Sequence, residues 1–350
     1  MSLSDVLPEV AAVNDEWDEK LRAAIDHKTK PLGALGQLET LALQIGRLQG
    51  TLRPSLVAPQ ILVFASDHGI AREGVSAYPQ DVTWQMVYNF LGGGAAINVF
   101  SRQHGIAVRI IDVGVNHDFR NEPGLIQEKV GPGTASMLQG TAMSEDECIT
   151  ALQAGRRQAQ AVLNLGANVI GMGEMGIGNT SSAALIMSRI LDLPLEECVG
   201  RGTGVDDEQY QRKLSILKQV ADLHSDARTP MEVLTAMGGF EIAAMVGAMV
   251  ESAAHGVLVL VDGFIASAAY LIASQLRPEI KHYAVFCHCS EEMGHRLMLS
   301  RLQAQPLLQI GMRLGEGSGC AVAYPLLQSA VIMLTDMASF SEAGVSEKAE

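Results

Sequence analysis

The sequence has few aromatic residues and is poor in positive charge. Aromatic residues make up 5% of the 350 positions, and 25 Lys and Arg face 39 Asp and Glu, giving a net charge of −14. Binding to a nucleic-acid backbone needs clustered cations, usually with interleaved aromatics, and no such patch occurs. The composition argues against a nucleic-acid-binding protein. An anionic ligand would need local cations or backbone N–H groups.

Cysteine is also scarce. The five cysteines are odd in number and scattered along the chain: Cys148, Cys198, Cys287, Cys289 and Cys320. The first 20 residues have neither a basic segment nor an apolar segment of the signal-peptide kind, so we expect a reducing, cytoplasmic location. Residues 287–289, Cys-His-Cys, could suggest a metal, but further ligands with C-x₂-C spacing are missing. We therefore predict structural thiols and no metal site.

Linkers and long apolar runs are missing too. No Ser/Pro/Gly run or charge block divides the chain, so one large domain with a smaller one is expected rather than two full domains. The most apolar region, 242–273, is interrupted by Glu251, His255 and Asp262. It predicts a buried helix, strand and helix, and we expect no membrane span.

Apolar spacing predicts an α/β fold. Residues 5–50 have helical periodicity broken at 30–33, which indicates two N-terminal helices. Helix-like segments then separate short apolar runs of strand type at 60–65, 107–113, 168–172, 257–261, 282–287 and, more weakly, 307–312. This alternation predicts a doubly wound, mostly parallel sheet of about six strands with helices on both faces.

Polar residues stand at or shortly after the end of each of these runs. These residues are Asp67, His68, Asp112, Glu174, Asp262, His288 and Glu316. Ligands of open α/β sheets bind outside the carboxyl ends of the strands, so we expect one shared site along that edge. The alternative is that these residues are ordinary polar strand ends and helix caps.

Two glycine-rich stretches suggest phosphate binding. Residues 171–182 run from a strand through a glycine loop into a helix, with Asn179 or Thr180 as the expected N-cap. No Gly-Lys-Ser/Thr follows, and Glu174 lies inside the loop, which favours a phosphate monoester beside a carboxylate. The alternative is a tight turn whose glycines serve packing.

The second glycine-rich stretch, 200–204, precedes Lys213. This lysine is a candidate point charge for the phosphate, with a solvated helix position as the alternative. The neighbouring Asp206-Asp207 pair fits either a weak magnesium site or a helix cap.

Glu316 lies between glycines in residues 311–320, after an apolar run and before a helix-like segment. Glycine on both sides allows unusual backbone conformations and close approach of a ligand. We predict that Glu316 is a catalytic base. The alternative is an acid that complements the start of a helix.

Together these segments resemble a known family, the nicotinate-nucleotide:dimethylbenzimidazole phosphoribosyltransferases, which build the lower-ligand nucleotide of cobalamin. The likeness runs from about residue 20 to about residue 340. The segments that carry it are 67–70, 74–76, 89–90, 92–98, 173–180, 200–204 and 315–319.

The resemblance implies transfer of the phosphoribosyl group of nicotinate mononucleotide to 5,6-dimethylbenzimidazole, without a cofactor. It implies a large domain at 55–325, a small helical domain from 1–54 and 326–350, and a homodimer. It places the phosphate on Gly176, Ile177, Gly178, Asn179, Thr180, Gly202 and Lys213. It places the bases near Ser76, Tyr78, Gln85, Met175, Leu314 and Gly315.

In this resemblance Glu316 is the base. Glu174 is a second carboxylate, which either stabilises positive charge on the ribose or stands in as base. Which residue of 76–78 contacts the azole stays open. Two rival functions are a magnesium-dependent transferase that uses Asp206-Asp207, and a nucleotide- or azole-binding protein without turnover.

Overall fold

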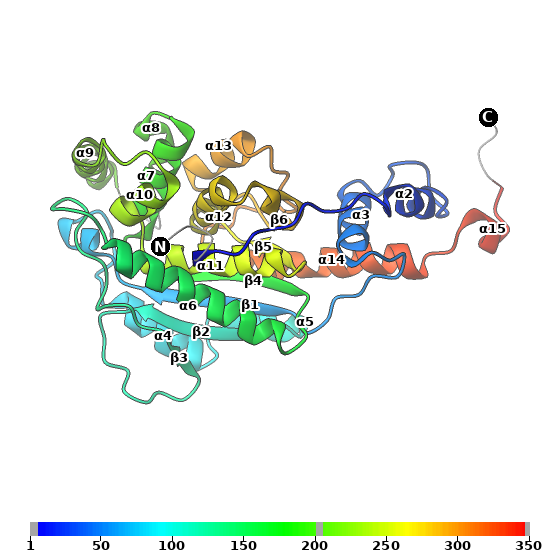
Figure 1. The fold of residues 1–350 in the computed structure, drawn as a ribbon, viewed down its shortest axis with the longest axis horizontal. Coiled ribbons are helices and arrows are strands. Elements are labelled where there is room, and N and C mark those ends of the chain that lie inside the picture. The colour runs from blue at the N-terminus through cyan, green and yellow to red at the C-terminus, as the bar shows by residue number, and fades with distance from the viewer. Residues whose placement is uncertain (1–5, 201–205, 347–350) are drawn as a thin grey trace.

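The computed structural model describes residues 6–200 and 206–346 and has one six-stranded sheet at its centre (Figure 1). All paired strands are parallel, in the order β3-β2-β1-β4-β5-β6. The strands are β1 (Gln60–Ser66), β2 (Ala107–Gly114), β3 (Leu125–Gln127), β4 (Val169–Met175), β5 (Leu258–Val261) and β6 (Ala284–Phe286). This order confirms the doubly wound α/β fold. Its switch point, between β1 and β4, is where such folds bind ligands.

One of the six strands is not the predicted one. Residues 307–312 were expected as the last strand, but only Leu308 forms a bridge, with His288. Pro306 precedes the segment and Gly311 has a φ of 76°, so the chain turns away after a short contact with the end of β6. The sixth strand is β3, three residues long, at the opposite edge of the sheet.

Helices cover both faces of the sheet. Alternate side chains of β1 divide two cores: Leu62 and Phe64 pack with α6, α7, α11 and α12, and Ile61 and Val63 pack with α3, α4, α5 and α14. The longer helices are α3 (Gln37–Gln49), α4 (Val82–Leu91), α6 (Glu145–Leu163), α7 (Asn179–Leu191), α9 (Asp207–Leu223), α11 (Phe240–Ala254), α12 (Phe264–Leu276) and α14 (Ser318–Asp336). The shorter ones are α2 (Asp18–Asp26), α5 (Ala96–His104), α8 (Leu195–Cys198), α10 (Pro230–Met237), α13 (Met293–Arg301) and α15 (Phe340–Ala343), with 3₁₀ turns at η1 (Gly69–Glu73) and η2 (Pro278–His282).

Helices from near both ends of the chain meet beyond one end of the sheet. The two predicted N-terminal helices are present as α2 and α3, and they lie with α15 and the end of α14 (Figure 1). Lys28 pairs with Ser339 in a bridge, and its Nζ donates to the Met337 carbonyl at 2.5 Å. Residues 6–11 instead pack on the main body, where Arg277 donates to the carbonyls of Leu7 and Pro8.

Among the described residues, α14 is long and apolar enough to cross a membrane by length and composition alone. The expectation of no span rested on 242–273, whereas α14 carries no charge before Asp336. In the fold, 61% of its apolar window is buried against the sheet and α3. It is a core helix of the α/β domain.

Helices α6 and α11 touch through glycine. A Cβ at Gly155 of α6 would overlap the carbonyl of Ala244, and one at Gly247 of α11 would overlap the carbonyl of Leu152. The two backbones are therefore in direct contact, and this contact holds one face of the sheet in place.

We expect Gly155→Ala to destabilise the fold by about 1–3 kcal/mol, because overlap with a backbone carbonyl outweighs the gain in helix propensity. The matched control is Gly140→Ala, where a Cβ meets open space. Thermal unfolding of both variants tests the packing. Equal midpoints for the two variants would contradict it.

Candidate active site

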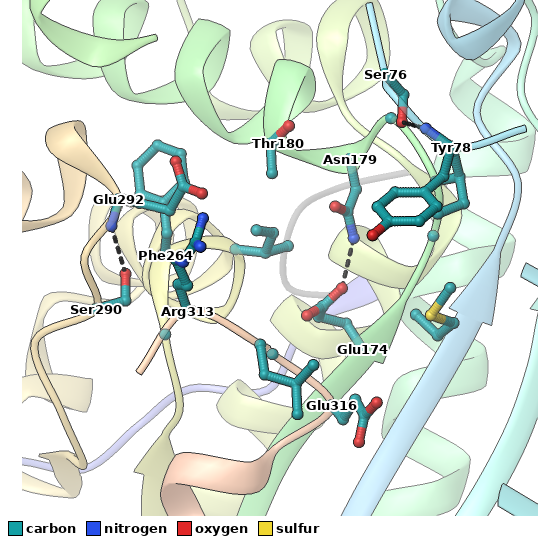
Figure 2. Close-up of a pocket in the computed structure, with 18 of the residues that line it drawn as sticks. Ser76, Tyr78, Glu174, Asn179, Thr180, Phe264, Ser290, Glu292, Arg313 and Glu316 are labelled. Carbon is teal, nitrogen blue, oxygen red and sulfur yellow. Dashed lines mark hydrogen bonds between the residues drawn. The ribbon is translucent and has the colours of Figure 1, made fainter. Parts of the chain in front are cut away.

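A cavity of about 360 Å³ opens at the carboxyl ends of β4, β5 and β6 (Figure 2). It lies beside the switch point of the sheet, where the predicted shared site was expected. Its wall is formed by residues 75–78, 82, 86, 174–180, 213, 262–266, 288, 290, 292 and 313–316.

Only part of the predicted polar edge reaches this cavity. Glu174, Asp262, His288 and Glu316 line it, as predicted. The prediction was wrong for the ends of β1 and β2, whose polar side chains are buried in the fold and serve its turns: Asp67 accepts the N–H of Asn116 (2.7 Å), His68 pairs with Glu241 (2.7 Å), and Asp112 accepts the N–H of Gly114 and Val115 (3.0 and 2.8 Å).

Glu316 has an unusual backbone. Gly315, Glu316 and Gly317 all have positive φ, at 86°, 65° and 85°. A residue with a Cβ pays about 1–2 kcal/mol for this left-handed conformation, so its surroundings must hold it there. The Glu316 side chain is 5% exposed, and its Oε2 accepts the N–H of Ile97 at the start of α5 (3.3 Å). Burial raises its pKa, the Ile97 N–H opposes this, and Asp262 adds to the rise.

Asp262, directly after β5, binds the start of α14. Its two carboxylate oxygens accept the N–H of Gly319 (2.6 Å) and of Gly317 (3.1 Å). His288 Nε2 lies 3.6 Å from the same side chain. Asp262 was recognised only as a polar strand end and was missed as a site residue.

Glu174 lies in a different environment. Asn179 donates to its Oε2 at 2.5 Å (Figure 2). Burial raises the pKa of Glu174 to about 8 despite this hydrogen bond. Asn179 and Thr180 are not the predicted N-caps, because Gly178, with a φ of 98°, takes that position and frees Asn179 to reach Glu174.

One end of the cavity, where the phosphate is predicted to bind, combines the start of α7 with a buried lysine. Lys213 is 1% exposed, so the alternative of a solvated helix lysine is wrong. Its Nζ donates to Thr180 Oγ1 (3.0 Å) and to the Gly200 carbonyl (3.3 Å). Burial lowers the pKa of Lys213 to about 8, and Glu292 opposes the change. Of the predicted phosphate ligands, Gly202 lies outside the described residues.

The predicted azole residues are mostly together. Ser76, Tyr78, Met175, Leu314 and Gly315 line the cavity, and the Ser76 hydroxyl accepts the N–H of Tyr78 at 3.2 Å. Tyr78 and Leu314 are 48% and 52% exposed and form its open rim.

Gln85 is the exception. It is exposed on α4 and does not line the cavity, whereas Val82 and Met86 do. Successive helix residues point about 100° apart, which turns Gln85 away from the wall that Met86 forms.

Another wall was not predicted. Phe264, Ser290, Glu292 and Arg313 form it, and Figure 2 places them across from Tyr78. Three of them come shortly after β5 and β6, so the strand-end rule could have found them had it been extended a few residues into each loop.

The residues considered for metals have other contacts. Asp206 is the N-cap of α9 and accepts the N–H of Gln209 at 2.9 Å, which supports the capping alternative. Cys287 and Cys289 are buried free thiols, like the other three cysteines. In the described part of the chain, no three His, Cys, Asp or Glu side chains are grouped to hold a metal ion.

Comparisons with known proteins agree with this geometry. A family model described as phosphoribosyltransferase matches residues 10–345. The chain is 53% identical over 339 residues to the nicotinate-nucleotide–dimethylbenzimidazole phosphoribosyltransferase of Cupriavidus taiwanensis, covering 97% of this chain and 98% of the relative. It is 54% identical over 332 residues to the protein of that name from Ralstonia nicotianae, with 94% of each covered. A crystal structure of CobT from Thermus thermophilus matches with a TM-score of 0.90 at 44% identity, covering 94% of this chain and 99% of that one.

The buried lysine predicts pH-dependent anion binding. Sulfate keeps its charge near neutrality, so its affinity should fall several-fold between about pH 7 and pH 9 as Lys213 loses its proton. Calorimetric titration measures this, with Lys213→Arg as the control that stays charged. A flat profile for the natural protein, or the same fall in the arginine variant, would exclude Lys213 as the anion's partner.

Proposed function

This chain belongs to the phosphoribosyltransferase family, and from that membership we propose that it transfers the phosphoribosyl group of nicotinate mononucleotide to 5,6-dimethylbenzimidazole. The products are α-ribazole 5′-phosphate and nicotinate. The observation that carries the proposal is a single cavity with a buried ammonium at one end and a carboxylate base beside an apolar wall at the other.

The 5′-phosphate is placed at the start of α7, where Lys213 supplies a positive charge and residues 176–180 supply the wall. Binding of the phosphate there holds the ribose between two further walls of the cavity. Met86, Met175 and Leu314 form an apolar surface for the benzimidazole next to Glu316. Phe264 and Arg313 lie across the cavity and are assigned to nicotinate, whose carboxylate Arg313 can meet.

Nicotinate leaves as a neutral pyridine, so its departure needs no strong acid. The attacking benzimidazole gains positive charge as one nitrogen bonds to the anomeric carbon, and the proton on its other nitrogen becomes acidic. Glu316 takes this proton. Attack from the face opposite nicotinate inverts the anomeric centre from β to α. Holding the two bases on opposite sides of one ribose is then most of the catalytic task.

We assign the two carboxyl groups different roles. With a pKa of about 8, Glu174 is mostly neutral at pH 7 and can donate a hydrogen bond to the substrate, but it is a poor proton acceptor. Glu316 is also buried and burial raises its pKa, but the N–H of Ile97 favours its ionised form, so we assign it the role of base.

The larger assembly is also part of the proposal. For the predicted domains at 55–325 and at 1–54 with 326–350, the bridge between Lys28 and Ser339 supports a unit that joins the two ends of the chain, whereas α14 runs unbroken across the boundary at 325. A homodimer is supported by the exposed apolar rim at Tyr78 and Leu314, which a partner subunit would cover. The five free thiols fit a cytoplasmic location.

Two matched substitutions test the division of roles. Glu316→Gln should lower turnover on the order of 100-fold or more, because the amide still accepts the Ile97 N–H but takes no proton. Glu174→Gln should cost less than about 10-fold at pH 7, because it replaces a neutral group with a neutral group of the same shape. Steady-state assays with product identification give both ratios.

The reverse ranking would make Glu174 the base. Near-normal turnover in both variants would remove the carboxyl mechanism altogether. Absence of nicotinate release from the natural protein with both substrates would favour a binding protein without turnover.

A further inference from the structure

Three neighbouring observations concern how Glu316 is held. Its loop has three consecutive residues of positive φ, and the middle one carries a side chain. On one side, a Cβ at Gly173 of β4 would overlap the Glu316 carbonyl, so the loop lies directly on that strand. On the other side is Asp262, which is 2% exposed.

Asp262, directly after β5, holds the loop through hydrogen bonds. It accepts the N–H groups of Gly317 and Gly319, which come one and three residues after Glu316. Gly319 and the Asp262 carboxylate are closely packed, because a Cβ at Gly319 would overlap the carboxylate. The negative side chain also lies at the positive end of α14, a favourable place for a buried carboxylate.

We propose that Asp262 is a positioning residue for the proton transfer: its carboxylate binds the two N–H groups just after Glu316 and so holds the turn that presents Glu316 to the azole. This inference rests on the proposed role of Glu316. Asp262 does not itself exchange a proton with the substrate; it acts through the loop and through its charge.

Several charged or titratable groups surround Glu316. Asp262 follows β5, Glu174 lies on β4, His288 follows β6, and Cys320 is on α14. From α5, Glu316 receives the uncharged N–H of Ile97. Of these, Asp262 is the group whose charge raises the pKa of Glu316, so removing that charge should lower this pKa.

The test is Asp262→Asn, which keeps the side-chain volume but loses the charge and one acceptor oxygen. We expect kcat to fall about 10-fold or more, and the acid limb of kcat/KM for the benzimidazole to move to lower pH. The azole's own titration is the same for both proteins and cancels in the comparison. The KM for the mononucleotide should stay within about 2-fold, because the phosphate end is separate.

Asp112→Asn is the matched control. Asp112 is a buried carboxylate at the end of β2 that also accepts two backbone N–H groups, but it lies away from the cavity. A loss of packing alone should affect thermal stability in both variants, whereas the pH profile should move only in the Asp262 variant.

A double variant distinguishes the positioning role of Asp262 from the proposed role of Glu316 as base. In Glu316→Gln, adding Asp262→Asn should lower turnover by less than about 3-fold, since residues that act as a unit are not additive. If Asp262→Asn lowered turnover equally with and without Glu316→Gln, and the pH profile did not move, the proposed role of Asp262 would be wrong. Near-normal turnover in Glu316→Gln alone would instead refute the proposed base.

If Asp262→Asn does not fold, as judged by circular dichroism, Asp262→Glu replaces it. This variant keeps the charge but displaces the carboxylate, so kcat should fall while the acid limb stays at the natural pH. Full activity, or an acid limb at lower pH, would overturn the inference.

Discussion

We propose that the geometry of the catalytic edge depends on one contact, the hydrogen bonds from the N–H groups at the start of α14 to the carboxylate of Asp262. That contact joins the end of β5 to a loop whose three residues all have left-handed backbones. We expect that losing this contact would let the loop leave the strained conformation at Glu316. The buried carboxylate in return gains a helix start that favours negative charge.

The parallel sheet explains why so many distant segments meet at this point. Parallel strands have their carboxyl ends at the same edge of the sheet. Residues as far apart in the sequence as Val75 and Glu316 therefore line one cavity. The same arrangement places two carboxyl groups in unequal surroundings. Burial raises the pKa of Glu174 to about 8, whereas the N–H of Ile97 opposes the rise in the pKa of Glu316. Unequal environments are how two acids acquire two roles.

The periodic features of the sequence were sufficient for the fold, and less so for the site. Three of the five firm strand predictions end in residues that line the cavity, but β3, with three residues, is too short for its periodicity to be recognised. The glycine loops and Glu316 carried strong local signals. Asp262, Glu292 and Arg313 did not, because their importance depends on long-range contacts. Lys213 was a candidate phosphate ligand with a solvated lysine as the alternative, and only the packing of its helix against α7 decided that it is buried.

The central claim is that Glu316 is ionised and Glu174 is neutral when the enzyme works. Nuclear magnetic resonance of protein labelled with ¹³C at the glutamate carboxyl carbons tests it directly, with the two signals assigned by the Glu316→Gln and Glu174→Gln variants. We expect Glu174 to titrate with a pKa of about 8 and Glu316 to titrate at lower pH. A neutral Glu316 at pH 7 beside an ionised Glu174 would contradict it.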